Sequence, residues 1–236
     1  MPIFEPNAEN SVLSPHIESC EDTPKTLSVN TQSIINSTWK QIISENENLY
    51  SSSLFRYVRH TQNENFITLY AQNNIEYKDV IGLRNSPDFL KQIPTQDQFC
   101  ALSLISLCYS ADGFGILVER NSGDWPHSLE LPGGFLRKSR GVDIDEQRSQ
   151  LLIGDLGTNL EKITSFNFAG FLSYTEICEM MMVYTIRLPL SFRDIQEQAP
   201  KKLHAFPPTY TTDSHDSTFN LPLHTPSKTV LDLLLH

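Results

Sequence analysis

The sequence predicts an α/β fold, an α/β/α sandwich with a mixed sheet and a small N-terminal helix–hairpin appendage. Two observations carry this prediction. Two strands, over residues 101–110 and 114–120, stand before a Pro-Gly-Gly turn and a helical stripe over 145–156. Two further strands follow, over 161–174 and 177–188. The chain has 236 residues, 39% of them hydrophobic, which is enough for one sizeable core.

The N-terminal half of the chain is expected to hold a tail, a helix and a hairpin. Residues 1–30 are rich in Pro, Ser, Glu and Asn with little periodicity, and we expect a disordered tail. Apolar residues at helical spacing predict an amphipathic helix over 31–46, and alternation over 54–60 and 66–72 predicts a hairpin. Residues 85–93 are expected to form a short helix or turn.

The C-terminal half ends in two further helices. One starts at 189–191 and runs to residue 198, and residues 201–212, with two consecutive prolines, are expected to form a loop. A final helix is predicted to begin near Ser227, a plausible N-cap, and to continue through Leu234. We therefore expect residues 31–98 to form the appendage and 99–236 the main domain.

Composition excludes several classes of partner. The net charge of −10 argues against a nucleic-acid or anionic-membrane surface. No apolar run reaches the roughly 20 residues of a membrane span, and the first residues lack the pattern of a signal peptide. The four cysteines show no CxxC spacing and are expected to be reduced thiols. A cytoplasmic location is expected, and the oligomeric state is open.

The most informative motif is Leu-Pro-Gly-Gly-Phe at 131–135, with a helical segment that reaches Gly157. Three carboxylates at positions i, i+3 and i+4 of such a helix would share one face and suit Mg²⁺ or Mn²⁺. In this chain those positions hold Leu151, Gly154 and Asp155, so one carboxylate stands where three are needed. A single Asp is a poor metal site unless other carboxylates or substrate phosphates complete it.

These residues resemble the Nudix family, whose box runs Gly, five residues, Glu, seven residues and Arg-Glu-hydrophobic-x-Glu-Glu-x-Gly-hydrophobic. With the last Gly on Gly157, Gln150 takes the place of Arg, Arg140 takes the place of the loop Glu, and the span from Gly134 is two residues longer than the family's. Segments around Trp39, residues 48–50, 55–56, 81–83, 168–171 and 214–218 are similar to the UDP-glucose/UDP-galactose pyrophosphatase branch. The resemblance covers about residues 33 to 236.

The resemblance implies a metal-assisted cleavage of a nucleoside diphosphate linked to another moiety, with Mg²⁺ or Mn²⁺ as cofactor. It implies three groups of site residues: catalytic Asp155, Asp216 and His215; substrate-binding Gly133, Gly134, Arg120, Arg137 and Lys138; and metal-binding Asp155, Asp143, Asp145 and Glu146. The expected partner is a small molecule that carries a nucleotide diphosphate.

Each assignment has a structural alternative. Leu151, Leu152 and Leu156 are at the spacing of an ordinary core stripe, and the basic residues after the Gly-Gly turn are typical of a solvated loop. His215 is equally compatible with a surface loop. Two functions therefore stay open: a hydrolase of a UDP-sugar-like substrate, and a catalytically inactive Nudix-fold module that binds a nucleotide or a protein.

Overall fold

A computed structural model describes residues 3–6, 15–20, 26–46, 49–63, 66–86, 88, 93–121, 125–158 and 165–235. The chain divides into two compact units. The first comprises Met1–Ser103, Phe135–Gln147 and Phe171–Met181, and the second comprises Leu104–Gly134, Arg148–Gly170 and Met182–His236. Each division between the units falls inside a strand or a helix.

The strands are β1 (Ile3–Pro6), β2 (Pro15–Ser19), β3 (Ser53–Gln62), β4 (Ile67–Glu76), β5 (Cys100–Tyr109), β6 (Gly115–Arg120), β7 (Ser128–Glu130), β8 (Gly133–Phe135), β9 (Ser165–Tyr174), β10 (Glu179–Arg187) and β11 (Leu203–Phe206). The α-helices are α1 (Val29–Glu45), α2 (Tyr77–Arg84), α4 (Ile144–Leu156), α5 (Phe192–Gln198), α6 (His215–Thr218) and α7 (Thr225–Leu234). Short 3-10 turns are η1 (Thr95–Asp97), η2 (Lys138–Arg140), η4 (Thr175–Ile177) and η5 (Thr212–Ser214).

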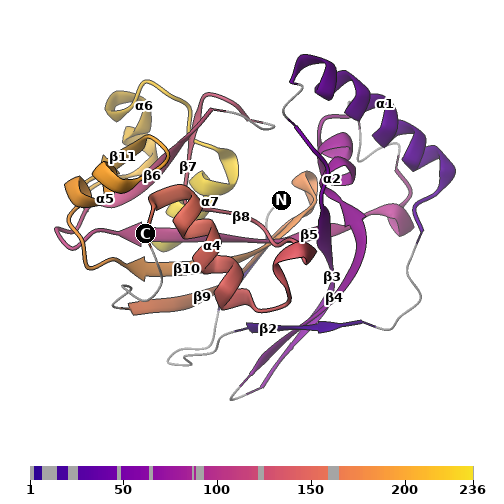
Figure 1. The fold of residues 1–236 in the computed structure, drawn as a ribbon, viewed down its shortest axis with the longest axis horizontal. Helices are drawn as coiled ribbons and strands as arrows, with labels where there is room; N and C mark the ends of the chain where they lie inside the picture. Colours follow the sequence, from indigo (N-terminus) through magenta and orange to yellow (C-terminus); the bar gives the residue numbers. More distant parts are fainter. Residues whose placement is uncertain are drawn as a thin grey trace. The chain divides into compact units, whose positions relative to one another are not determined.

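The first unit contains a mixed sheet. Strands β3 and β4 pair as the predicted antiparallel hairpin, and β2 runs parallel to β4 (Figure 1). Strand β3 also pairs antiparallel with the start of β5, where Arg56 lies opposite Ala101. The predicted α/β class with a mixed sheet is therefore confirmed.

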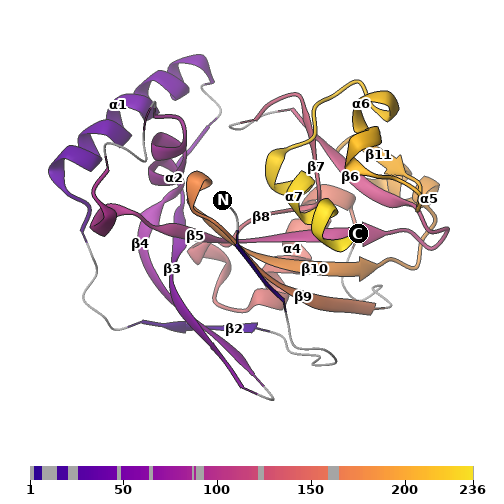
Figure 2. The same cartoon turned by 180° about the vertical axis from the view of Figure 1, so that it is seen from behind.

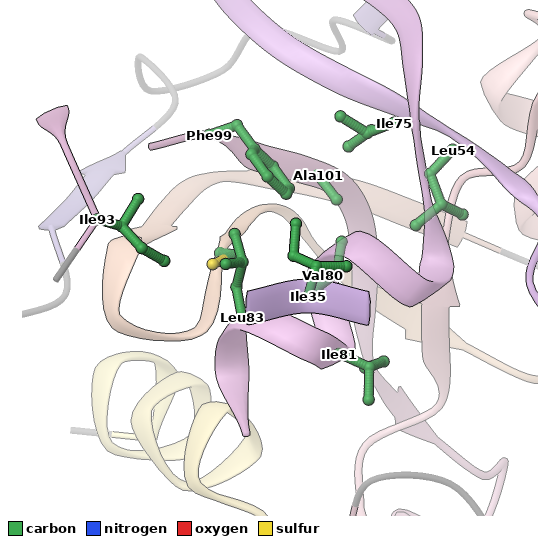
Figure 3. Packing of buried hydrophobic residues seen from close by; sticks show 10 residues of the cluster. Ile35, Leu54, Ile75, Val80, Ile81, Leu83, Ile93, Phe99 and Ala101 are labelled. Atoms are coloured by element: carbon green, nitrogen blue, oxygen red, sulfur yellow. The ribbon is translucent and has the colours of Figure 1, made fainter. Parts of the chain in front are cut away.

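Helices α1 and α2 pack against each other and supply apolar side chains to the core of the first unit. The side chain of Ser28 accepts from Thr31 N at the start of α1, as an N-cap does. Gly82 of α2 lies so near α1 that a Cβ on it would be 2.9 Å from the carbonyl oxygen of Ile35. Figure 3 shows the cluster, in which Ile35, Leu54 and Leu83 are each at most 1% exposed. Helix α2 was not predicted from the sequence.

The second unit is built around β6, which pairs antiparallel with both β7 and β11 (Figures 1 and 2). The turn from β5 to β6 uses Gly113 at φ 88°, a conformation that glycine adopts without a steric penalty. The prediction of a loop over residues 201–212 is wrong in part, because Leu203–Phe206 forms β11. Its buried ends, Leu203 and Phe206, supply the apolar surface that a four-residue strand needs.

Three predicted helices are confirmed with small changes at their starts. Helix α4 begins at Ile144, and α5 begins at Phe192 behind Ser191, whose side chain accepts from Asp194 N. Helix α7 begins at Thr225, so Ser227 is not its N-cap. The Ser227 hydroxyl is fully buried and accepts a hydrogen bond from Leu131 N instead.

Some predictions fall on parts of the chain outside the described residues. These are most of residues 85–93, the start of the strand predicted from residue 161, and much of the predicted 1–30 tail. The described residues of that tail include β1, β2 and the start of α1. Within the described residues, no helix is long and apolar enough to cross a membrane.

Candidate functional site

The Pro-Gly-Gly turn of the second unit joins β7 to β8 and is held on two sides by hydrogen bonds. Leu131 N donates to the Ser227 hydroxyl at 2.9 Å, and Ser106 N donates to the Pro132 carbonyl at 2.8 Å. The backbone of this turn is therefore fixed by groups from β5 and α7.

Gly133 is required by close packing at this turn. A Cβ there would lie 2.2 Å from the carbonyl oxygen of Leu104, a distance that no real Cβ adopts. At Gly134 a Cβ would lie 3.1 Å from Cδ2 of Leu151, which is tight but less severe. Both glycines are thus explained by packing inside the chain, because the Leu104 backbone fills the Cβ position of Gly133 and the Leu151 side chain adjoins that of Gly134.

Asp155 lies in the last turn of α4 and is only 4% exposed. Its Oδ2 accepts from Gly133 N at 3.0 Å, and its Oδ1 accepts from the Lys201 ammonium at 2.6 Å. Both carboxylate oxygens are therefore engaged, one in fixing the turn and one in an ion pair. The Lys201 side chain keeps 39% of its surface exposed.

Glu130 and Arg120 form a second ion pair beside this one. On the antiparallel strands β6 and β7, Val118 is opposite Glu130 and Arg120 is opposite Ser128, so the two charged side chains are diagonal neighbours. Arg120 Nε lies 2.7 Å from Glu130 Oε2, with the Glu130 side chain 8% and the Arg120 side chain 26% exposed.

Burial raises the pKa of Glu130 to about 7. The positive charge of Arg120 opposes this rise, the negative charge of Asp155 adds to it, and the ammonium of Lys201 again opposes it. Glu130 thus lies within electrostatic range of the other three charged groups. The four form one cluster, called here the acid–base cluster: Arg120, Glu130, Asp155 and Lys201.

A second group of charges lies next to the acid–base cluster in the sequence, where Glu119 precedes Arg120 and Lys202 follows Lys201. Glu119 Oε2 is 2.8 Å from the Lys202 ammonium and 2.9 Å from His204 Nε2. The hydrogen bond from Lys202, and then that from His204, lowers the pKa of Glu119. Lys202 therefore forms an ion pair with Glu119, as Lys201 does with Asp155.

His215, predicted as catalytic, is 4% exposed in α6. Its Nε2 is 2.7 Å from the Leu221 carbonyl and must donate to it, so Nδ1 accepts from the Tyr210 hydroxyl at 2.7 Å. Both ring nitrogens are thus occupied in holding this segment together. Asp216 follows in α6, and its side chain lies outside the described residues.

Arg137 and Lys138 belong to the first unit. Arg137 donates through its backbone N–H to Gln147 Oε1 at 2.7 Å and through its guanidinium to the Tyr50 hydroxyl at 2.8 Å. Lys138 lines a cavity of about 280 Å³ together with residues of β2 and β4, among them Ile17. Arg137 and Lys138 thus lie in the first unit, and the acid–base cluster lies in the second.

Asp143, Asp145 and Glu146 also belong to the first unit, at the start of α4. The Asp143 carboxylate accepts from the backbone N–H groups of Asp145, at 2.9 Å, and Glu146, at 3.1 Å. Asp143 thus caps the helix, and the two following carboxylates stand in its first turn, where the helix dipole favours negative charge.

The predicted metal ligands are divided between the two units, with Asp155 in the second and Asp143, Asp145 and Glu146 in the first. Within the described part of the chain, no three His, Cys, Asp or Glu side chains come together in a group able to hold a metal ion. On the α4 face, Leu151 and Gly154 provide no side-chain oxygen. The residues present therefore do not fit Mg²⁺ or Mn²⁺ at Asp155.

Two residues of the acid–base cluster, Glu130 and Lys201, were not predicted from the sequence. Glu130 alternates with Leu129 and Leu131, a pattern typical of a strand whose polar side faces water. Lys201 lies in a segment predicted as a loop, 46 residues from its partner Asp155. No local pattern in the sequence joins these residues.

No family model and no curated protein match this chain. Among solved structures it is similar to the NUDIX domain of Shewanella oneidensis NrtR complexed with ADP ribose (11% identity, TM-score 0.37, covering 61% of this chain and 93% of that one). It is also similar to a bifunctional NMN adenylyltransferase/ADP ribose pyrophosphatase from Francisella tularensis (14%, 0.43, 66% and 45%) and to RenU, a Nudix hydrolase from M. smegmatis (15%, 0.34, 56% and 79%). Likenesses at these values assign neither a family nor an activity to this chain.

Proposed function

We propose that this chain is a Nudix-type module that binds a nucleoside diphosphate linked to another moiety at the Gly133 turn of its second unit. The observation that carries the proposal is the pair of partly exposed cations, Arg120 and Lys201, each held by a buried carboxylate in the acid–base cluster beside this turn. Arg and Lys are the side chains that bind phosphates, through charge-assisted hydrogen bonds. The net charge of −10 supports a small molecule rather than nucleic acid or membrane.

Binding without metal-dependent cleavage is the function that the contacts support best. Asp155 is the one carboxylate on the α4 face, and its two oxygens are engaged by Gly133 and Lys201. Hydrolysis assisted by Mg²⁺ or Mn²⁺ needs a metal that keeps several oxygen ligands, and this cluster supplies too few.

A hydrolase remains the second candidate because of one residue, Glu130. A carboxyl with a pKa of about 7 is suited to exchange protons near neutral pH. Glu130 would then act as a general base toward an attacking water, with Arg120 holding its carboxylate in place. The substrate class would be the UDP-sugar-like compounds or other diphosphate-linked nucleotides.

One panel experiment separates these candidates. The full chain is incubated with UDP-glucose, ADP-ribose and related compounds with Mg²⁺ or Mn²⁺, and both binding and product release are measured. The favoured function predicts binding of at least one compound without product. The second candidate predicts turnover that falls on the order of 10²-fold in Glu130→Gln. Absence of binding and of turnover across the panel would exclude both.

A further inference from the structure

We propose that the Lys201 ammonium takes the place beside Asp155 that a divalent metal would need, so that this site binds a phosphate-type anion without metal. The first part of this inference, the exclusion of metal, is independent of the proposed function. The second part, the binding of the anion, rests on it.

The contacts of Asp155 disfavour a metal as long as Lys201 is present. Lys201 Nζ lies 2.6 Å from Oδ1, and Gly133 N lies 3.0 Å from Oδ2. Each carboxylate oxygen has a second lone pair, so a metal would bind next to these donors and would place a double positive charge beside the ammonium. A metal that took the place of Gly133 N would release the turn itself.

The exposed charges of the cluster point to an anion as the next ligand. Each carboxyl group of the cluster, Asp155 and Glu130, is paired with a cation, Lys201 and Arg120 respectively. The two carboxylates are nearly buried, with side chains 6% and 8% exposed, whereas the two cations keep 39% and 26% of theirs exposed. A ligand that approaches from solvent therefore meets the cation of each ion pair before the carboxylate.

Lys201 has the donors that such a ligand requires. An ammonium carries three N–H groups, and the bond to Asp155 Oδ1 takes one of them. The buried carboxylate holds the ammonium in place, so less side-chain entropy remains to be lost when an anion binds. Lys201 is thus a positioned point charge next to the turn that Gly133 begins.

The test uses Mn²⁺ alone and inorganic pyrophosphate in EDTA as probes of the full chain. Electron paramagnetic resonance of free Mn²⁺ should show no micromolar site in the wild type. Calorimetry should show pyrophosphate binding in EDTA that weakens on the order of tenfold or more in Lys201→Met, as loss of a charge-assisted hydrogen bond predicts. Lys201→Arg should retain most of the binding.

Lys202→Met is the matched control, because it removes the same charge from the neighbouring position, where the partner is Glu119. It should bind pyrophosphate as the wild type does. If Lys201→Met fails to fold, the double variant Lys201→Met, Asp155→Asn removes both charges and avoids an unpaired buried carboxylate.

Three results would overturn the inference. They are a micromolar Mn²⁺ site in the wild type that Asp155→Asn abolishes, equal pyrophosphate binding in the Lys201 and Lys202 variants, and no pyrophosphate binding at all in EDTA. Failure of every nucleotide in the panel would instead refute the proposed function, and the Mn²⁺ measurement would still decide what stands at Asp155.

Discussion

Glu130→Gln should remove a pH dependence of the free energy of unfolding that the wild type shows between about pH 4.5 and 7. The carboxyl is buried on β7, and burial raises its pKa from 4.5 to about 7 in the folded chain. The unfolded chain therefore loses this proton near pH 4.5, while the folded chain holds it until near pH 7. Between these values the folded state binds more protons, so its stability falls as the pH rises and is constant above both.

The magnitude follows from the interval between the two pKa values. At about 1.36 kcal/mol for each pH unit, an interval from 4.5 to about 7 corresponds to roughly 3 kcal/mol of stability lost by the wild type. Gln keeps a carbonyl oxygen for Arg120 and cannot titrate. The difference in unfolding free energy between Glu130→Gln and wild type should therefore shift by about 3 kcal/mol in favour of the variant from pH 4.5 to 8.

Urea unfolding followed by circular dichroism at four pH values measures this difference. Glu197→Gln is the control, because Glu197 is an exposed carboxylate on α5 whose side chain is 64% exposed. Its difference from wild type should stay nearly constant across the series. A constant difference for Glu130→Gln as well would show that Glu130 is ionised in the folded protein throughout, and the reasoning about its burial would be wrong.

Three further predictions concern the turn and the helix face. Gly133→Ala should lower the melting temperature strongly because its Cβ would meet the Leu104 carbonyl at 2.2 Å, and an unchanged melting temperature would contradict that geometry. Gly154→Ala, in α4 with nothing within 4 Å of the added Cβ, should instead stabilise the chain by about 0.5–1 kcal/mol in urea titrations, and a loss of stability would count against the open space there. Leu151→Glu with Gly154→Glu, added to Lys201→Met, rebuilds three carboxylates on one helix face and should create Mn²⁺ binding visible by electron paramagnetic resonance; a folded triple variant without it would show that the α4 face cannot hold metal.

The fold was predictable where the signal is local. The alternation at the start of β4 and the continuous buried runs of β5 and β10 are each visible within a single segment. Strand β11 was not predictable in this way, because it has four residues and depends on pairing with β6. Its stability comes from a partner that lies far away in the sequence.

The residues of the candidate site likewise fall into those that a local motif predicts and those that only tertiary packing brings together. Gly133, Arg120 and Asp155 could be found because they lie in or next to a recognisable motif. Their partners Glu130 and Lys201 could not, since burial and an ion pair across 46 residues are products of tertiary packing. The sequence therefore predicts a weakened metal site, whereas the contacts show a lysine at the one carboxylate of the α4 face.

Calorimetry of the full chain with UDP-glucose and with ADP-ribose, in EDTA and then in Mg²⁺, tests the central claim most directly. We expect at least one of these ligands to bind in EDTA, with a dissociation constant that Mg²⁺ changes little, because Lys201 and Arg120 supply the positive charge. Binding that appears only with Mg²⁺ would contradict it and would return the diphosphate site to a metal.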